Sequence, residues 1–249
     1  MERNISLEPT IVVDDIFGKF STVSDQVKTF SELCSEIQSG TCPDSKVVCS
    51  AGIDAYRVST MKSYLDEQER KSPVKLEYET SIANRRDVHK YEQSNVLLGP
   101  VTRTGDSYQA PFVLSSRNEL IIDHQTGIHI QGMVGIEACR QMALCICESV
   151  AKRAGMQHPS ISLSKYDLEF GTFLFPLPST VVGRISSAEE DDRGWIHLYM
   201  ELGVEQSGKM PVTAQMKCIL IPRDVMEAIE IRRADKAIEA YLANRVETD

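Results

Sequence analysis

The feature that most constrains this chain is a long apolar helix, predicted from Gly132 to about Arg153. Gly155 can cap its end, because glycine adopts the left-handed conformation that often follows a helix. The apolar side chains of this helix cover nearly its whole circumference. They are Met133, Val134, Ile136, Met142, Ala143, Leu144, Ile146 and Val150. A helix that is apolar nearly all round must be buried, so the rest of the fold has to surround it.

Strands are predicted on both sides of this helix in the sequence. After it we expect strands over residues 160–170, 180–186, 195–204 and 212–221, and the last two alternate clearly between apolar and polar residues. Before it, residues 94–99 and 107–114 are expected to pair as a hairpin about Gly105. An apolar strand end is expected at residues 120–122. This pattern is typical of an antiparallel sheet with one covered face, so the predicted fold class is α+β.

Seven residues in and before the first turns of the helix are candidate site residues. They are His124, His129, Gly132, Met133, Glu137, Arg140 and Gln141. The N-terminus of a helix has unsatisfied backbone N–H groups and the positive end of the helix dipole. The backbone near Gly132 can therefore receive a carbonyl oxygen that gains negative charge during a reaction.

Three motifs resemble the A-factor biosynthesis (AfsA-like) hotdog family. They are Asn95-Val96-Leu97-Leu98, the His-x-x-x-x-His-x-x-Gly-Met turn from His124 to Met133, and Glu137-Ala138-Cys139-Arg140-Gln141. The resemblance covers about residues 88–222. Two features depart from the family pattern: Gln131 stands where proline is frequent, and the chain carries one repeat where many members carry two. The resemblance implies a hotdog fold, in which an antiparallel sheet wraps around one long central helix.

Two interpretations are open for most of the candidate residues. Burial would raise the pKa of Glu137 and make it a usable general base, or Glu137 pairs with Arg140 and only holds the helix entrance. His124 and His129 either act on a substrate hydroxyl or carbonyl, or stabilise the loop. Arg140 would be the ligand of a phosphorylated acceptor, because its planar fork fits phosphate oxygens. The histidine spacing is not typical of zinc, and we expect no metal and no cofactor.

The resemblance implies an enzyme that transfers a β-ketoacyl group from a carrier protein to a small hydroxylated acceptor. An acyl carrier protein or a CoA thioester is the expected acyl donor. Two other thioester activities stay open, a 3-hydroxyacyl dehydratase and a thioesterase. A third alternative is a subunit without turnover that binds acyl chains or a carrier protein.

Composition excludes several other classes of protein. The formal charge of −9 argues against a nucleic-acid partner. No apolar run approaches the ~20 residues of a membrane helix, and residues 1–10 lack a signal-peptide core. The seven cysteines show no disulfide or zinc spacing. Together these features predict a cytoplasmic protein with free thiols.

Three parts are predicted along the chain. Residues 1–90 form a mostly helical extension, with helices over 27–37 and 53–70; residues 91–222 form the hotdog domain; and residues 223–249 form a C-terminal helix on the sheet or on a second subunit. A single hotdog exposes a sheet edge, so we expect a homodimer with its sites at the interface.

Overall fold

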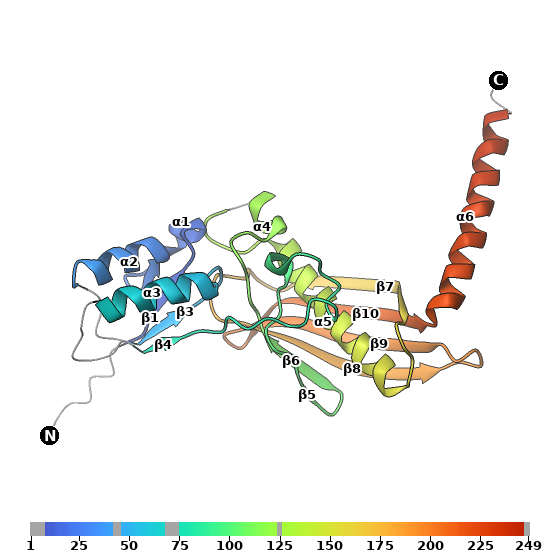
Figure 1. Cartoon of the computed structure of the whole chain (residues 1–249), viewed down its shortest axis with the longest axis horizontal. Coiled ribbons are helices and arrows are strands. Elements are labelled where there is room, and N and C mark those ends of the chain that lie inside the picture. Colours follow the sequence, from blue (N-terminus) through green and yellow to red (C-terminus); the bar gives the residue numbers. More distant parts are fainter. Residues whose placement is uncertain (1–7, 42–45, 68–74, 124–125, 247–249) are drawn as a thin grey trace.

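The computed structural model describes residues 8–41, 46–67, 75–123 and 126–246. Figure 1 shows three parts in a row: an N-terminal unit at one end, a central sheet with a long helix on it, and a C-terminal helix that projects from the other end. None of the described helices is both long enough and apolar enough to cross a membrane.

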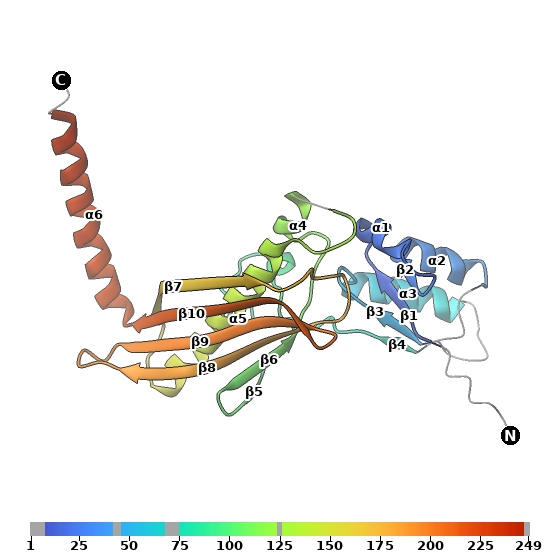
Figure 2. The same ribbon diagram turned by 180° about the vertical axis from the view of Figure 1, so that it is seen from behind.

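The long helix α5 spans Gly132–Arg153, as predicted. It lies on a sheet of six antiparallel strands in the order β5-β6-β8-β9-β10-β7 (Figure 2). The strands are β5 Thr102–Thr104, β6 Ser107–Pro111, β7 Ser160–Phe170, β8 Thr180–Glu190, β9 Ile196–Gln206 and β10 Lys209–Ile221. Gly183 on β8 lets the helix approach closely, because a Cβ there would lie 2.8 Å from side-chain atoms of Ile146 and Met142. This arrangement is the hotdog fold that the sequence predicted.

The alternation predicted in the last two strands is confirmed. The apolar residues of β9 and β10 that were expected to face the core are all buried. They are Ile196, Leu198, Met200, Leu202, Val204, Val212, Ala214, Met216, Cys218 and Leu220. The turn about Gly105 is also confirmed, because Thr104 pairs with Ser107, but the first strand of this hairpin is β5 and not residues 94–99. The expected strand at residues 94–99 is instead a short 3-10 helix, Gln93–Asn95, followed by one isolated bridge from Leu98 to Phe112.

The prediction that residues 1–90 are mostly helical missed a small parallel sheet. Four short strands, in the order β2-β1-β3-β4, alternate with the helices of this unit. The elements are β1 Thr10–Val13, a 3-10 helix Asp15–Phe17, α1 Gly18–Ser21, β2 Val27–Thr29, α2 Phe30–Gln38, β3 Val47–Cys49, α3 Ala55–Glu67 and β4 Leu76–Glu77. The two predicted helices are present, but the first begins only after β2, where Thr29 and Glu32 form a capping box.

The prediction of an apolar strand end at residues 120–122 is wrong, because these residues belong to the short helix α4, Glu119–Asp123. Asn118 starts this helix: its side chain accepts a hydrogen bond from the Leu120 N–H at 3.0 Å, and its carbonyl accepts from Ile121 and Ile122. An asparagine in this position is a favourable N-cap. The chain therefore approaches the candidate site from helix α4 and not from a strand.

The C-terminal helix α6 spans Arg223–Val246 and points away from the sheet (Figure 1). Within residues 223–244 every side chain is exposed except those of Met226 and Ile229, which are half-buried. The helix was expected on the sheet or on a second subunit, and it does not pack on the sheet of its own chain.

Candidate functional site

The N-terminus of α5 is the centre of the candidate site. Gln131 precedes the helix in an extended conformation (φ −63°, ψ 150°) and makes no side-chain capping bond to it. The Gln131 amide donates instead to the Leu120 carbonyl, which ties α4 to the start of α5. The first turn carries no acidic residue. The positive end of this buried helix is therefore left for another acceptor.

Aromatic and aliphatic side chains surround this helix end and are unusually exposed. A Cβ on Gly132 would lie 2.8 Å from a ring carbon of Phe170, so this ring lies directly over the glycine. Ile128, Met133, Phe170 and Phe173 are 41%, 53%, 56% and 61% exposed. We call these four residues the mouth patch. Exposed apolar surface of this kind marks a site of contact with an apolar ligand or another chain.

His129 lies in a tight turn beside the mouth patch. Thr126 Oγ1 accepts hydrogen bonds from the Ile128 and His129 N–H groups at 3.2 and 3.1 Å, and it donates to the His129 carbonyl at 3.0 Å. The His129 ring packs on Phe173, with ring centroids 4.8 Å apart, and its Nδ1 lies 3.3 Å from Thr126 Oγ1. The Thr126 hydroxyl already donates its one proton to the carbonyl and accepts from two backbone N–H groups, so its bonds fix the turn that carries His129.

Glu137 forms the most highly connected charge network near the site. Arg140 donates to it from Nε at 2.7 Å and from Nη2 at 2.9 Å. Lys90 Nζ lies 2.7 Å from Glu137 Oε1, and Gln141 Nε2 donates to the same oxygen at 3.0 Å. The Glu137 side chain is only 15% exposed. The expected pair with Arg140 is therefore present, together with two further donors.

The predicted upward shift in the pKa of Glu137 is wrong. Burial raises this pKa, but hydrogen bonds from Arg140, Lys90 and Gln141, together with the charge of Arg140, lower it by more. The pKa of Glu137 therefore lies below the usual value of a glutamate, and the pKa of Arg140 is raised by its bond to Glu137. A carboxylate held by three donors is a weak base, so this geometry favours a positioning role for Glu137.

The side chain of Gln141 is completely buried in the single chain. Its Oε1 accepts from the Leu97 N–H at 2.9 Å, and its Nε2 donates to the Asn95 carbonyl at 2.8 Å. The amide thus fixes residues 95–97 against α5. These bonds favour a structural role for Gln141, because they join the first motif to the third.

Sequence reasoning missed Lys90 and underrated Asn95. Nothing in the local sequence marks Lys90, since its pairing with Glu137 depends on how the loop crosses the helix. Asn95 is buried, and its side chain accepts from the Glu119 N–H at 3.0 Å, which links residues 95–97 to α4. Its place in the first motif was the available signal for this role.

The remaining predictions for the site have different outcomes. His124 lies outside the described residues. Within the described part of the chain, no group of three or more His, Cys, Asp or Glu residues could hold a metal ion.

Three cavities of about 740–760 Å³ are present. One lies on the sheet, one between the N-terminal unit and the hotdog domain, and one beside the end of α5. Glu137, Arg140 and His129 line none of these three, and the exposed mouth patch leaves the helix end open in one chain.

Comparison with known protein families identifies the central part of the chain. The family model of the A-factor biosynthesis hotdog domain matches residues 72–222. This range contains the whole six-stranded sheet, helix α5 and all seven candidate site residues. A comparison with curated proteins finds no match.

Solved structures that resemble the chain are distant in sequence. The dehydratase heterocomplex ApeI:P from Xenorhabdus doucetiae is 17% identical, with a TM-score of 0.43 over 56% of this chain and 92% of that chain. A hypothetical thioesterase with coenzyme A from Streptococcus pneumoniae is 10% identical, with a TM-score of 0.40 over 56% and 98%. A conserved protein from Pseudomonas aeruginosa is 13% identical, with a TM-score of 0.40 over 56% and 100%. With TM-scores below 0.5, these likenesses do not bear on activity.

Proposed function

The chain belongs to the A-factor biosynthesis hotdog family, and we propose on this basis that it is an enzyme that processes acyl thioesters. The proposed reaction transfers a (β-keto)acyl group from a carrier protein, or from a CoA thioester, to a small hydroxylated acceptor. One observation carries the proposal: the family match encloses a buried helix whose N-terminus is uncapped and open beside His129.

The proposed chemistry uses a base and the helix end. Nε2 of His129 accepts the proton of the acceptor hydroxyl, and the oxygen attacks the thioester carbonyl carbon. The carbonyl oxygen becomes an oxyanion, which the backbone N–H groups of Gly132 and Met133 stabilise. When this intermediate collapses, the carbon–sulfur bond breaks, an ester forms, and the thiolate takes the proton from the imidazole. His124 is a second candidate for the base.

Arg140 is proposed to bind the acceptor. Glu137 holds its guanidinium through Nε and Nη2, and the Arg140 side chain is 35% exposed. Held in this way, the group keeps Nη1 outside its pair with Glu137, and a phosphate on the acceptor would meet a cation of fixed orientation. Glu137 and Lys90 are positioning residues in this scheme.

The open site supports a homodimer. Among the described strands, β7 is the last of the sheet and pairs with β10 alone, so its outer edge carries backbone groups that no described strand pairs. Unpaired edges of this length favour pairing with a second chain. A second copy on β7 would bring another surface to the mouth patch, because Phe170 ends this strand.

Intact mass spectrometry of an acyl-loaded carrier protein tests the proposal. The carrier thioester is incubated with the enzyme, with and without candidate alcohols. Acyl transfer predicts loss of the acyl group only when the right alcohol is present, with formation of its ester. Loss without an alcohol would indicate a thioesterase, and loss of one water from a 3-hydroxyacyl group a dehydratase. An unchanged thioester with every acyl chain and alcohol would contradict catalysis and favour a binding subunit.

A further inference from the structure

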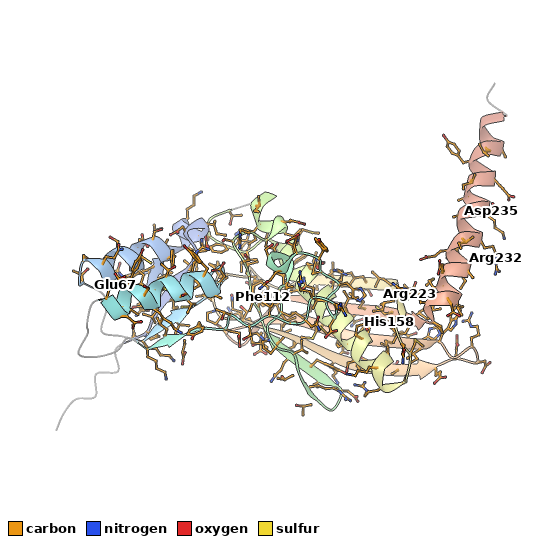
Figure 3. The ribbon with its side chains drawn as sticks, viewed as in Figure 1. Glu67, Phe112, His158, Arg223, Arg232 and Asp235 are labelled. Carbon is orange, nitrogen blue, oxygen red and sulfur yellow. The ribbon has the colours of Figure 1, made fainter. Side chains whose placement is uncertain are left out.

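Helix α6 carries an apolar stripe that its own chain does not cover. Ile231, Ile238 and Leu242 are 64%, 59% and 56% exposed. They are spaced seven and four residues apart, so they lie on one face of the helix. Figure 3 shows Arg223, Arg232 and Asp235 along a helix that stands away from the rest of the molecule. A lone helix in water gains little stability from its backbone bonds and needs packing on an apolar face, so this stripe requires a partner surface.

The base of α6 lies at one end of the free sheet edge. Ile221, the last residue of β10, pairs with Ser160, the first residue of β7. Helix α6 begins at Arg223, directly after this pair. Any chain that pairs with β7 near Ser160 therefore lies beside the first turn of α6.

The charges on β7 favour pairing with a second copy of the same strand. Lys165 and Asp167 are two residues apart, point to the same face and form an ion pair within the strand. In an antiparallel pair of two β7 strands centred on Tyr166, each Lys165 would face the partner's Asp167. Opposite charges directly across an antiparallel pair stabilise it, while like charges destabilise it. A register centred on Lys165 would place two lysines opposite each other, and one centred on Asp167 would place two aspartates opposite each other while pairing Lys165 with the partner's Glu169.

This register brings the base of α6 to the partner's candidate site. Pairing centred on Tyr166 places Ser160 opposite residue 172 of the second copy, which lies between Phe170 and Phe173. Neighbouring strands lie about 4.8 Å apart and β7 lies between β10 and the partner strand, so the first turns of α6 would start about two strand spacings from the partner's mouth patch. Both surfaces are apolar and exposed in the single chain, and one contact would cover both.

We propose that α6 of each chain packs on a second copy, beginning beside the mouth patch, so that each candidate site is bordered by a helix from the other chain. This rests on the dimer proposed above. The contact closes an open surface and gives the site an apolar wall suited to an acyl chain.

Photo-crosslinking in the dimer of the whole chain tests this contact and does not require catalytic activity. A photoreactive phenylalanine derivative replaces Ile231 in one protein and Lys236, on the opposite side of the helix, in a matched control. Dimers mixed from isotopically light and heavy chains separate cross-links between chains from those within one chain. We expect the Ile231 probe to give inter-chain cross-links to residues 126–136 or 168–174, and the Lys236 probe to give few.

A further variant tests whether the cross-links depend on the apolar face of α6. Ile238→Asp, combined with the Ile231 probe, is expected to lose the inter-chain cross-links while light scattering still shows a dimer. Cross-links confined to one chain, or none in a sample that is dimeric, would overturn the proposal. A positive cross-link with no thioester activity would contradict the proposed function and leave the α6 contact intact.

Discussion

Lys90 Nζ lies 2.7 Å from Oε1 of Glu137, so the loop that crosses α5 is joined to the helix by a largely buried ion pair. Arg140 and Gln141 bind the same carboxylate from the helix itself. Glu137 therefore receives donors from two elements and fixes the loop beside the proposed site. This arrangement suits a residue that orients others better than one that takes up a proton.

Glu137→Gln is expected to destabilise the fold by about 1–3 kcal/mol at neutral pH, because it leaves two cations without their carboxylate. The pKa of Glu137 is lowered in the folded protein. Its charge therefore contributes stability above the unfolded-state pKa of about 4.3, and this contribution is lost as pH falls through the lower folded-state pKa. Urea unfolding at pH 7 and at about pH 3 should show the two proteins converging in acid.

The matched control is Glu148→Gln on the same helix. Glu148 pairs with His89 at 3.0 Å, but these side chains are 31% and 42% exposed. Exposed pairs contribute about 0–1 kcal/mol, so this change should be nearly neutral. If the two substitutions lower the free energy of unfolding equally at pH 7, the network at Glu137 contributes no more stability than an exposed ion pair.

Much of the central fold was predictable because its signals are long. Helix α5 is 22 residues long with apolar side chains nearly all round, and β9 and β10 alternate over 11 and 13 residues. The N-terminal sheet was missed because its strands have only two to four residues, too few to show a period. Helix α4 was mistaken for a strand because a short apolar run cannot separate the two, although Asn118 was the available capping signal.

The site was predictable in its position and less so in its chemistry. The motifs located Glu137, Arg140 and Gln141 on one part of α5, as the structure has them. The pKa of Glu137 was predicted in the wrong direction because burial was counted without its donors. The amide of Gln141 and the ammonium of Lys90 have partners distant in sequence, and no local pattern reveals such partners.

His129→Gln is expected to lower kcat by about 10²–10⁴-fold if Nε2 of this residue is the general base. The acidic limb of the pH–rate profile, which reports protonation of the base, should disappear with it. Thr126→Val should have a smaller effect, since it removes the hydroxyl bonds that hold the turn but leaves the imidazole in place. A full rate for His129→Gln, together with a large loss for His124→Ala, would transfer the role to His124.

Arg140→Lys distinguishes a phosphorylated acceptor from an unphosphorylated one. With a phosphorylated acceptor, the acceptor KM should rise sharply while the thioester KM stays unchanged, because lysine cannot reproduce the planar fork. With water or a plain alcohol, the change should act through Glu137 and lower kcat. Steady-state kinetics with the two substrates varied separately measure this. Unchanged values of both parameters would remove Arg140 from the site.

Two glycines of α5 should respond differently to alanine. A Cβ at Gly135 would lie 2.7 Å from Val212, which is buried, so Gly135→Ala should cost about 1–3 kcal/mol of stability by overpacking. A Cβ at Gly132 meets the ring of Phe170, which is 56% exposed and can swing aside. Gly132→Ala should therefore leave the melting temperature nearly unchanged but lower kcat/KM, because it crowds the helix end. A large stability loss at Gly132 with normal activity would contradict this placement of the site.

Charge exchange on β7 tests the proposed dimer and its register together. Lys165→Glu should weaken the dimer, because it places a carboxylate opposite the partner's Asp167 on both sides of the axis. Asp167→Lys alone should weaken it for the same reason with the sign reversed. The double variant exchanges the two charges and restores opposite pairs, so its dissociation constant should return towards that of the original chain. Sedimentation equilibrium at low and high salt measures all four proteins, and salt should reduce the differences because it screens exposed charges. If both single variants dimerise as tightly as the original chain, pairing centred on Tyr166 is excluded; an active monomer would exclude the dimer itself.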